Sequence, residues 1–272
     1  MSEWTDVFEC KLKKVPFILV VDTSRSMKEN GRIEAVNHAL EALISGLKEI
    51  QEAEAEWDIQ LAILTFDQSA RWVVPLTSVS EFKYQELHCL AGKASYAEAF
   101  RNLNEKLSLH EYMWHKGKLA QPQIFFLTAS EPEEDKSYWE ERETLLWNTW
   151  FRESMRTAIL LGNAADSHSE AARAAREFVG MNEYGIHCLV DAEDVSLLFQ
   201  GYLDQFKNSL LLSKKMSNGG VFRMGMKGLR ISDSNNSDDW STGSDIWDEI
   251  IESLSDFEGV EFNFDSDEAG FI

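Results

Sequence analysis

Asp22-Thr23-Ser24-Arg25-Ser26-Met27 is the stretch of this sequence that decides the fold. It follows an apolar run at residues 15–21, which is typical of a strand buried on both faces. It precedes residues 32–50, whose apolar positions recur at helical spacing. A buried strand is therefore predicted to deliver one carboxylate and two hydroxyls, at alternate positions, into the turn before a helix. Oxygen groups in this arrangement suit a hard divalent cation.

Strand and helix patterns alternate along the rest of the chain. Further strands are predicted at residues 58–66, 70–76, 121–128, 156–162 and 185–190, and further helices at 96–107, 137–153, 167–180 and 194–212. This alternation predicts an α/β fold with a doubly wound, mostly parallel sheet, in which residues 70–76 form one antiparallel edge strand. Ligands of such sheets bind beyond the carboxyl ends of the strands, so Asp22 and Ala129 are expected at one rim.

The carboxyl-terminal end of the chain is strongly acidic. The 272 residues carry a formal net charge of -21, and residues 231–272 hold 13 of the 47 Asp and Glu with no Lys or Arg. We predict an α/β domain at 1–212, a linker at 213–243 and an acidic tail at 244–272. We expect no nucleic-acid binding, because it depends on clustered Lys and Arg. A basic protein partner is favoured instead.

Apolar residues recur at helical spacing within the acidic tail. They are Trp247, Ile250, Ile251, Leu254 and Phe257. This pattern predicts a short amphipathic helix that docks in a groove of a partner protein. Two alternatives stay open: a plain solvated tail, and a tail whose acids approach the rim of Asp22 in the same chain.

The sequence also indicates a cellular compartment. No apolar run is long enough to span a membrane, and the first residues lack the pattern of a secretory signal. Cys10, Cys89 and Cys188 are far apart and odd in number, which favours reduced thiols over disulfides. We therefore expect a cytoplasmic protein without membrane contact.

Several short segments occur together in one order. They are Asp22-Thr23-Ser24-Arg25-Ser26-Met27, Arg32-Ile33-Glu34-Ala35-Val36-Asn37, Leu64-Thr65-Phe66-Asp67, Val73-Val74-Pro75-Leu76, Gly92-Lys93-Ala94-Ser95 and Phe126-Leu127-Thr128-Ala129-Ser130-Glu131-Pro132. Together they resemble cytosolic bacterial von Willebrand factor A (vWA) proteins, closest to the TerY type of tellurium-resistance and stress gene clusters. The resemblance covers roughly residues 15–212.

The resemblance implies a metal-ion-dependent adhesion site that binds Mg²⁺ or Mn²⁺ through three loops. The first loop, D-x-S-x-S, is intact as Asp22, Ser24 and Ser26. In the second loop Ala94 stands where relatives have the ligand Thr, and in the third Ala129 replaces the acidic residue of T-D-G-x-P. We expect a degenerate site with no cofactor beyond weak Mg²⁺ binding.

Loss of the cation would leave Asp22 as an unpaired, partly buried carboxylate, which is costly. One hypothesis is that Lys93, or less favourably Arg25, supplies the missing positive charge. The simpler interpretation is that both are solvent-facing loop residues. Ser95 lies next to Ala94, and in the alternative function it rescues a metal-dependent binding module.

No nucleophile, phosphate-loop or paired-carboxylate motif stands out, so the chain is not expected to be an enzyme. The resemblance implies a protein-interaction adaptor or scaffold of a bacterial stress-response or defence system. Its partners would include a kinase and a PP2C-type phosphatase of the same gene cluster. Arg25, Lys93, Ser95 and the apolar face of the tail are the predicted interaction residues.

Overall fold

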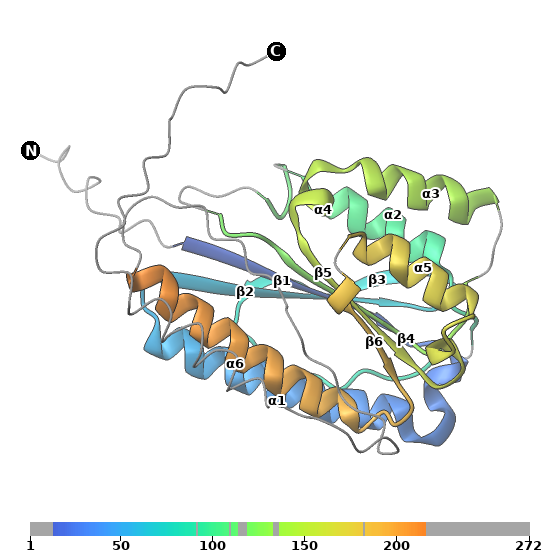
Figure 1. The fold of residues 1–272 in the computed structure, drawn as a ribbon, viewed down its shortest axis with the longest axis horizontal. Helices are drawn as coiled ribbons and strands as arrows, with labels where there is room; N and C mark the ends of the chain where they lie inside the picture. Colours follow the sequence, from blue (N-terminus) through green and yellow to red (C-terminus); the bar gives the residue numbers. More distant parts are fainter. Residues whose placement is uncertain are drawn as a thin grey trace, which may run out of the picture. The chain divides into compact units, whose positions relative to one another are not determined.

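The computed structural model describes residues 13–90, 92–108, 110–113, 119–132, 136–181 and 183–215. Within them a six-stranded sheet has the order β3-β2-β1-β4-β5-β6 and carries helices on both faces (Figure 1). The strands are β1 (Lys13–Asp22), β2 (Trp57–Phe66), β3 (Ala70–Ser78), β4 (Gln123–Thr128), β5 (Met155–Leu161) and β6 (Ile186–Leu189). The helices are α1 (Arg32–Ala53), α2 (Tyr96–Lys106), α3 (Lys136–Trp147), α4 (Thr149–Glu153), α5 (Glu170–Val179) and α6 (Asp194–Lys215).

The direction of the strands confirms the predicted fold class. Every neighbouring pair in the sheet is parallel except β2 and β3, which are antiparallel. The predicted turn joins them: Asp67 N donates to Ser69 O at 2.9 Å, and Ser69 N donates back to Asp67 Oδ1 at 3.1 Å. Because β1 and β4 are parallel neighbours, Asp22 and Thr128 end at the same rim of the sheet.

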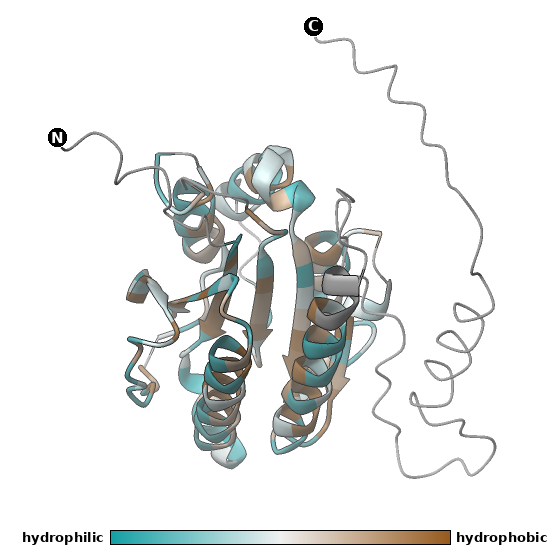
Figure 2. Cartoon of the chain, turned by 90° about the vertical axis from the view of Figure 1, so that its left-hand side faces the viewer, coloured by the Kyte–Doolittle hydropathy of each residue, from teal (hydrophilic) through white to brown (hydrophobic). Residues whose placement is uncertain are grey.

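β1 is buried on both faces, as its uninterrupted apolar run predicts. Phe17, Leu19 and Val21 belong to the apolar core shared with α1 and α6. Ile18 and Val20 point to the opposite face and belong to the core shared with α2 and α5. Figure 2 shows the strands as largely hydrophobic and the helices that flank them as mixed. This two-sided burial fixes the position of the loop that follows β1.

An aromatic cluster joins β1 and β4 to α6. The ring of Phe17 lies 5.1 Å from that of Phe206 and 6.0 Å from that of Tyr202, edge to face in both cases. The Tyr202 hydroxyl donates to Gln123 Oε1 at 2.6 Å, and both residues are buried. Burial raises the pKa of Tyr202 well above its ordinary value, so the phenol is neutral and acts as a donor.

One predicted helix is wrong. Residues 137–153 form two helices, because Asn148 has an extended backbone with φ -65° and ψ 122°. Its side-chain oxygen accepts from Phe151 N at 3.1 Å and so caps α4. Its Nδ2 donates to Asn104 Oδ1 at 2.7 Å and to Leu107 O at 3.1 Å. An asparagine whose side chain both accepts and donates hydrogen bonds to nearby backbone and side-chain groups favours a helix cap over a helix interior.

Some predictions lie outside the described residues. α6 continues to Lys215; the rest of the predicted linker and the acidic tail at 244–272 are not described. The tail residues predicted to dock also lie outside the described residues: Trp247, Ile250, Ile251, Leu254 and Phe257. Cys89 and Cys188 are free thiols, and Cys10 is not described. In the described part of the chain, no helix has the length and apolar character needed to span a membrane.

Substitution of Tyr202 by Phe is expected to lower the free energy of unfolding by about 1–3 kcal/mol, because Gln123 Oε1 loses its donor in a buried site. Urea denaturation measures this difference. Tyr184→Phe is the matched control, since Tyr184 is 48% exposed. Equal midpoints for the two variants would show that the buried hydrogen bond contributes nothing to stability.

Candidate functional site

Three loops meet at the rim where β1 and β4 end. The first leads from Asp22 into the 3-10 helix η2 (Arg25–Gly31), the second covers residues 92–95 before α2, and the third covers residues 129–132 after β4. Backbone hydrogen bonds join the first loop to its neighbours. Thr23 N donates to Phe66 O at 2.8 Å, and Arg25 N donates to Gly92 O at 3.0 Å. The rim is thus assembled from segments far apart in sequence.

Asp22 lies at the base of the rim and is fully buried. Its Oδ1 accepts from Ser24 N at 2.7 Å. Its Oδ2 accepts from Thr128 Oγ1 at 2.8 Å and from Ala129 N at 3.3 Å. The expectation that Asp22 would be unpaired without a cation is therefore wrong. Hydrogen bonds from two backbone amides and one hydroxyl offset the cost of burying the carboxylate. Motifs of side chains do not reveal the backbone amides.

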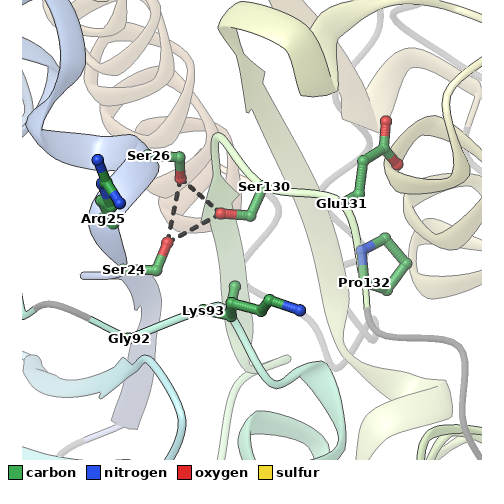
Figure 3. A pocket seen from close by; sticks show the side chains of 9 residues that line it. Ser24, Arg25, Ser26, Gly92, Lys93, Ser130, Glu131 and Pro132 are labelled. Carbon is green, nitrogen blue, oxygen red and sulfur yellow. Dashed lines mark hydrogen bonds between the residues drawn. The ribbon is translucent and has the colours of Figure 1, made fainter.

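Three serine hydroxyls form a cluster above Asp22 (Figure 3). Ser24 Oγ lies 3.0 Å from Ser26 Oγ and 2.8 Å from Ser130 Oγ, and the last two oxygens are 2.5 Å apart. The sequence predictions included Ser24 and Ser26 but not Ser130. One feature of the sequence could have indicated Ser130 as a site residue. It lies two residues after Thr128, just beyond the end of a strand that leads to the same rim.

Tyr96 supports the third loop from below. Its hydroxyl donates to Ser130 O at 2.7 Å and lies 3.3 Å from Thr128 Oγ1. Burial raises the pKa of Tyr96 well above its ordinary value, so the phenol keeps its proton. Ser130 N in turn donates to Thr128 Oγ1 at 3.1 Å. These bonds fix the backbone that presents the Ser130 hydroxyl.

Small apolar side chains occupy the two positions where the resemblance implies further metal ligands. Ala94 is 2% exposed and Ala129 is 4% exposed, and neither side chain offers an oxygen. Ser95 begins α2, where its Oγ accepts from Glu98 N at 3.4 Å. Its backbone N donates to Asp67 O at 2.7 Å. The Ser95 hydroxyl thus serves as a helix cap.

This set of donors fits Mg²⁺ poorly. Asp22, the carboxylate at the base of the rim, already accepts three hydrogen bonds. Mg²⁺ requires near-ideal octahedral oxygen geometry and gives up water reluctantly, so neutral hydroxyls alone are weak compensation. Elsewhere among the described residues, no group of three or more His, Cys, Asp and Glu could hold a metal ion.

A pocket of about 450 Å³ opens over the hydroxyl cluster. Its lining consists of Ser24, Arg25, Ser26, Gly92, Lys93, Ala94, Ser130, Glu131 and Pro132. Arg25 and Lys93 are exposed, and Figure 3 shows them on two different sides of the hydroxyls. The structure thus brings together both predicted cations and the intact first loop.

Glu131 lines the same pocket but directs its charge elsewhere. Its Oε2 accepts from Ala171 N at 2.7 Å, in the first turn of α5. The positive end of the helix dipole stabilises a carboxylate at this position. In Figure 3 the Glu131 carboxylate points away from the three serines. The pocket therefore has cations at its opening, and the Glu131 carboxylate is not directed at its hydroxyls.

Arg32 supports the hydroxyl cluster from behind. It is buried, and its Nη1 donates to Ser26 O at 2.9 Å. The guanidinium packs against Gly162, where an added Cβ would collide with it. Gly162 also has φ +57°, which an L side chain adopts at a cost. A glycine after β5 thus makes room for the arginine that anchors the first loop.

The comparison with protein families finds one match, which covers part of the chain. Residues 17–131 match the family described as von Willebrand factor type A domain. No curated protein matches the chain.

Solved structures share the fold. The pilus adhesin SpaC from Lactobacillus rhamnosus GG has 12% identity and a TM-score of 0.52, over 72% of this chain and 31% of the adhesin chain. Proximal thread matrix protein 1 from the mussel byssus has 13% identity and a TM-score of 0.51, over 71% of this chain and 47% of its own. The chain spans less than half the length of either structure, and at such identities the likeness concerns the fold alone.

Gly162→Ala is expected to destabilise the protein more than Gly31→Ala does. Both glycines have positive φ, +57° and +67°, so each substitution costs about 1 kcal/mol in backbone strain. A Cβ at position 31 has open space around it apart from Glu34 at 3.9 Å, whereas at position 162 it must displace Arg32. The displacement adds about 1–3 kcal/mol. Urea unfolding of both variants measures the difference, and equal losses would contradict the anchoring role of Arg32.

Proposed function

We propose that this chain, whose residues 17–131 match a vWA domain, is a cytoplasmic protein-interaction adaptor of a bacterial stress-response or defence system. In this proposal the rim of the vWA domain has lost its metal ion, and the acidic tail docks onto a partner. The TerY-like resemblance of the sequence supplies the cellular setting. It also suggests a kinase and a PP2C-type phosphatase as partners.

The observation that carries the proposal is the rim itself. Ala94 and Ala129 are buried where ligands would stand, and Asp22 is satisfied by protein donors instead. The rim nevertheless keeps an open pocket with the exposed cations Arg25 and Lys93. In this proposal, an open rim lined by hydroxyls and cations serves to recognise another molecule.

The wider fold class supports an interaction role. vWA domains commonly act as protein-interaction modules, and the two solved structures are a pilus adhesin and a thread matrix protein. Neither description is that of an enzyme. We therefore propose that the chain is not an enzyme and that it acts through binding.

A second candidate is a metal-dependent binding module. One observation favours it: the three hydroxyl oxygens lie 2.5–3.0 Å apart. Neighbouring ligands of an octahedral Mg²⁺ ion are about 2.9 Å apart, given Mg–O distances near 2.0–2.1 Å. The shortage of carboxylates and the use of Ser95 as a helix cap make the metal-free adaptor the better proposal.

The wild-type chain is expected to bind Mg²⁺ and Mn²⁺ no more tightly than about millimolar, because its rim lacks a second carboxylate. Restoring the family pattern with Ala94→Thr, Ala129→Asp and Ser130→Gly is expected to strengthen binding at least about tenfold, or 1.4 kcal/mol. Isothermal titration calorimetry of both proteins measures the change.

Asp22→Asn in the restored background is the control and should abolish the gained affinity. Wild-type binding tighter than millimolar that is lost on Asp22→Asn would establish the metal-dependent alternative instead. Unfolding curves of each variant ensure that a lost signal is not a lost fold.

Docking by the tail predicts a defined effect on partner capture. Tagged full-length protein is expected to retain proteins encoded by the adjacent genes, and Ile251→Asp is expected to lower their recovery at least about tenfold. The added charge would lie on the proposed apolar docking face. Quantitative mass spectrometry of the retained proteins provides the measurement.

Ser253→Asp is the matched control, because it adds the same charge off the apolar positions of the tail. Its recovery of partners should stay within about twofold of wild type. Equal capture by the wild-type, Ile251→Asp and Ser253→Asp proteins would refute docking through the apolar face.

A further inference from the structure

The two edges of the sheet differ in how they are protected. β3 forms one edge, and β6 forms the other (Figure 1). β3 contains Pro75, which has no N–H to donate, and the exposed Arg71. Its register with β2 is irregular between Leu61 and Leu64. Proline, bulges and charged side chains keep a sheet edge from pairing with another chain, so β3 is a protected edge.

β6 lacks these protective features. Its residues, Ile186-His187-Cys188-Leu189, include no proline and no Lys, Arg, Asp or Glu. They pair with β5 in an unbroken parallel register. A strand with a single neighbour directs the N–H and C=O of every second residue away from that neighbour. In the part of the chain that the structure describes, no strand lies on the outer side of β6, so these backbone groups can pair with an added strand.

Exposed apolar side chains occur on both sides of this strand in the sequence. Seven large hydrophobic residues are exposed in the described part of the chain, and four of them flank β6. Tyr184 lies two residues before the strand, and Val190, which is 83% exposed, follows it directly. Met181 and Leu197 lie in the segments that lead into β6 and out of it. Single exposed apolar residues are ordinary, whereas several beside one open edge indicate an interaction surface.

The charge at the carboxyl end of β6 is negative. Asp191 and Glu193 follow the strand and are exposed, and Asp194 begins α6. None of the three forms an ion pair with a described residue. Burial raises the pKa of the Cys188 thiol, and the charge of Arg176 from α5 opposes this, so a cation lies near the strand itself. The end of the edge beyond β6 therefore attracts positive charge.

We propose that the outer edge of β6 binds an extended segment of a partner protein as an added strand of the sheet. This segment carries apolar residues at alternate positions, which pack beside Tyr184 and Val190. It carries Lys or Arg at the end that lies beside Asp191 and Glu193. Backbone pairing supplies affinity in such strand addition, and the alternate side chains supply specificity. The inference goes beyond the proposed function, because this surface involves neither the rim nor the acidic tail.

A basic partner suits this edge better than a second copy of the chain. Each copy carries a net charge of -21, so two copies repel each other. A strand as short as β6 also offers few backbone hydrogen bonds. Attraction between opposite charges at its carboxyl end therefore has to add to the pairing, and a basic segment provides that attraction.

An NMR titration of the full-length, isotope-labelled chain with a synthetic peptide tests the proposal. The peptide alternates valine with threonine and carries two lysines at one end. The largest changes in amide chemical shift are expected at residues 184–190. The same peptide with every amide N-methylated keeps its side chains but has no backbone N–H to donate. It is expected to bind at least about tenfold more weakly.

Val190→Lys and Val73→Lys form a matched pair, because each places a lysine at an exposed valine of one sheet edge. Val190→Lys should weaken binding of the lysine peptide at least about fivefold, whereas Val73→Lys should leave it within about twofold of wild type. Glu193→Lys should weaken the lysine peptide and strengthen a version with glutamates in place of the lysines.

Three results would each overturn the proposal: shift changes centred away from residues 184–190, equal affinity for the N-methylated peptide, or unchanged affinity in Val190→Lys. Sedimentation velocity of the chain alone examines the other occupant. A dimer that Val190→Lys abolishes would assign this edge to a second copy instead. Metal titration and the tail variants test the proposed function separately, so the two can fail independently.

Discussion

The hydrogen bonds of the buried Asp22 carboxylate are the constraint on which the rest of the rim depends. An uncompensated charge at this depth would be strongly destabilising. Ser24 N, Thr128 Oγ1 and Ala129 N offset it, and these donors come from the loop after β1, the end of β4 and the loop after β4. The same bonds therefore hold the first and third loops at a fixed separation. The hydroxyls of Ser24 and Ser130 then lie within hydrogen-bond distance of each other.

The fold sets this arrangement before any ligand takes part. β1 is buried on both faces and pairs in parallel with β4, so their carboxyl ends lie side by side. Arg32 anchors the first loop through Ser26 O, and Tyr96 anchors the third through Ser130 O. The hydroxyl cluster is thus supported by a cation from one face of the sheet and a phenol from the other. Such preorganisation reduces the ordering that a ligand must impose when it binds.

The parts of the structure that the sequence predicted are those encoded by local pattern. The periodicity of apolar residues predicted the strands and helices, including the antiparallel strand β3, because burial of the apolar positions dictates the fold. The break at Asn148 was not predicted because its side chain also donates to Asn104 Oδ1 and Leu107 O, which only the tertiary fold brings near. Ser130 was missed because its partners lie more than 100 residues earlier in the chain. The compensation of Asp22 was missed because backbone amides are the same in every sequence.

The substitutions at the rim are physically consistent with one another. A carboxylate at position 129 would place a second negative charge beside the buried Asp22, and without a cation the two would repel each other strongly. Alanine removes that repulsion and keeps the backbone N–H that donates to Asp22 Oδ2. The Ser130 hydroxyl lies within hydrogen-bond distance of the Ser24 and Ser26 hydroxyls. Ala129 and Ser130 are therefore both consistent with the proposed rim that works without a metal ion.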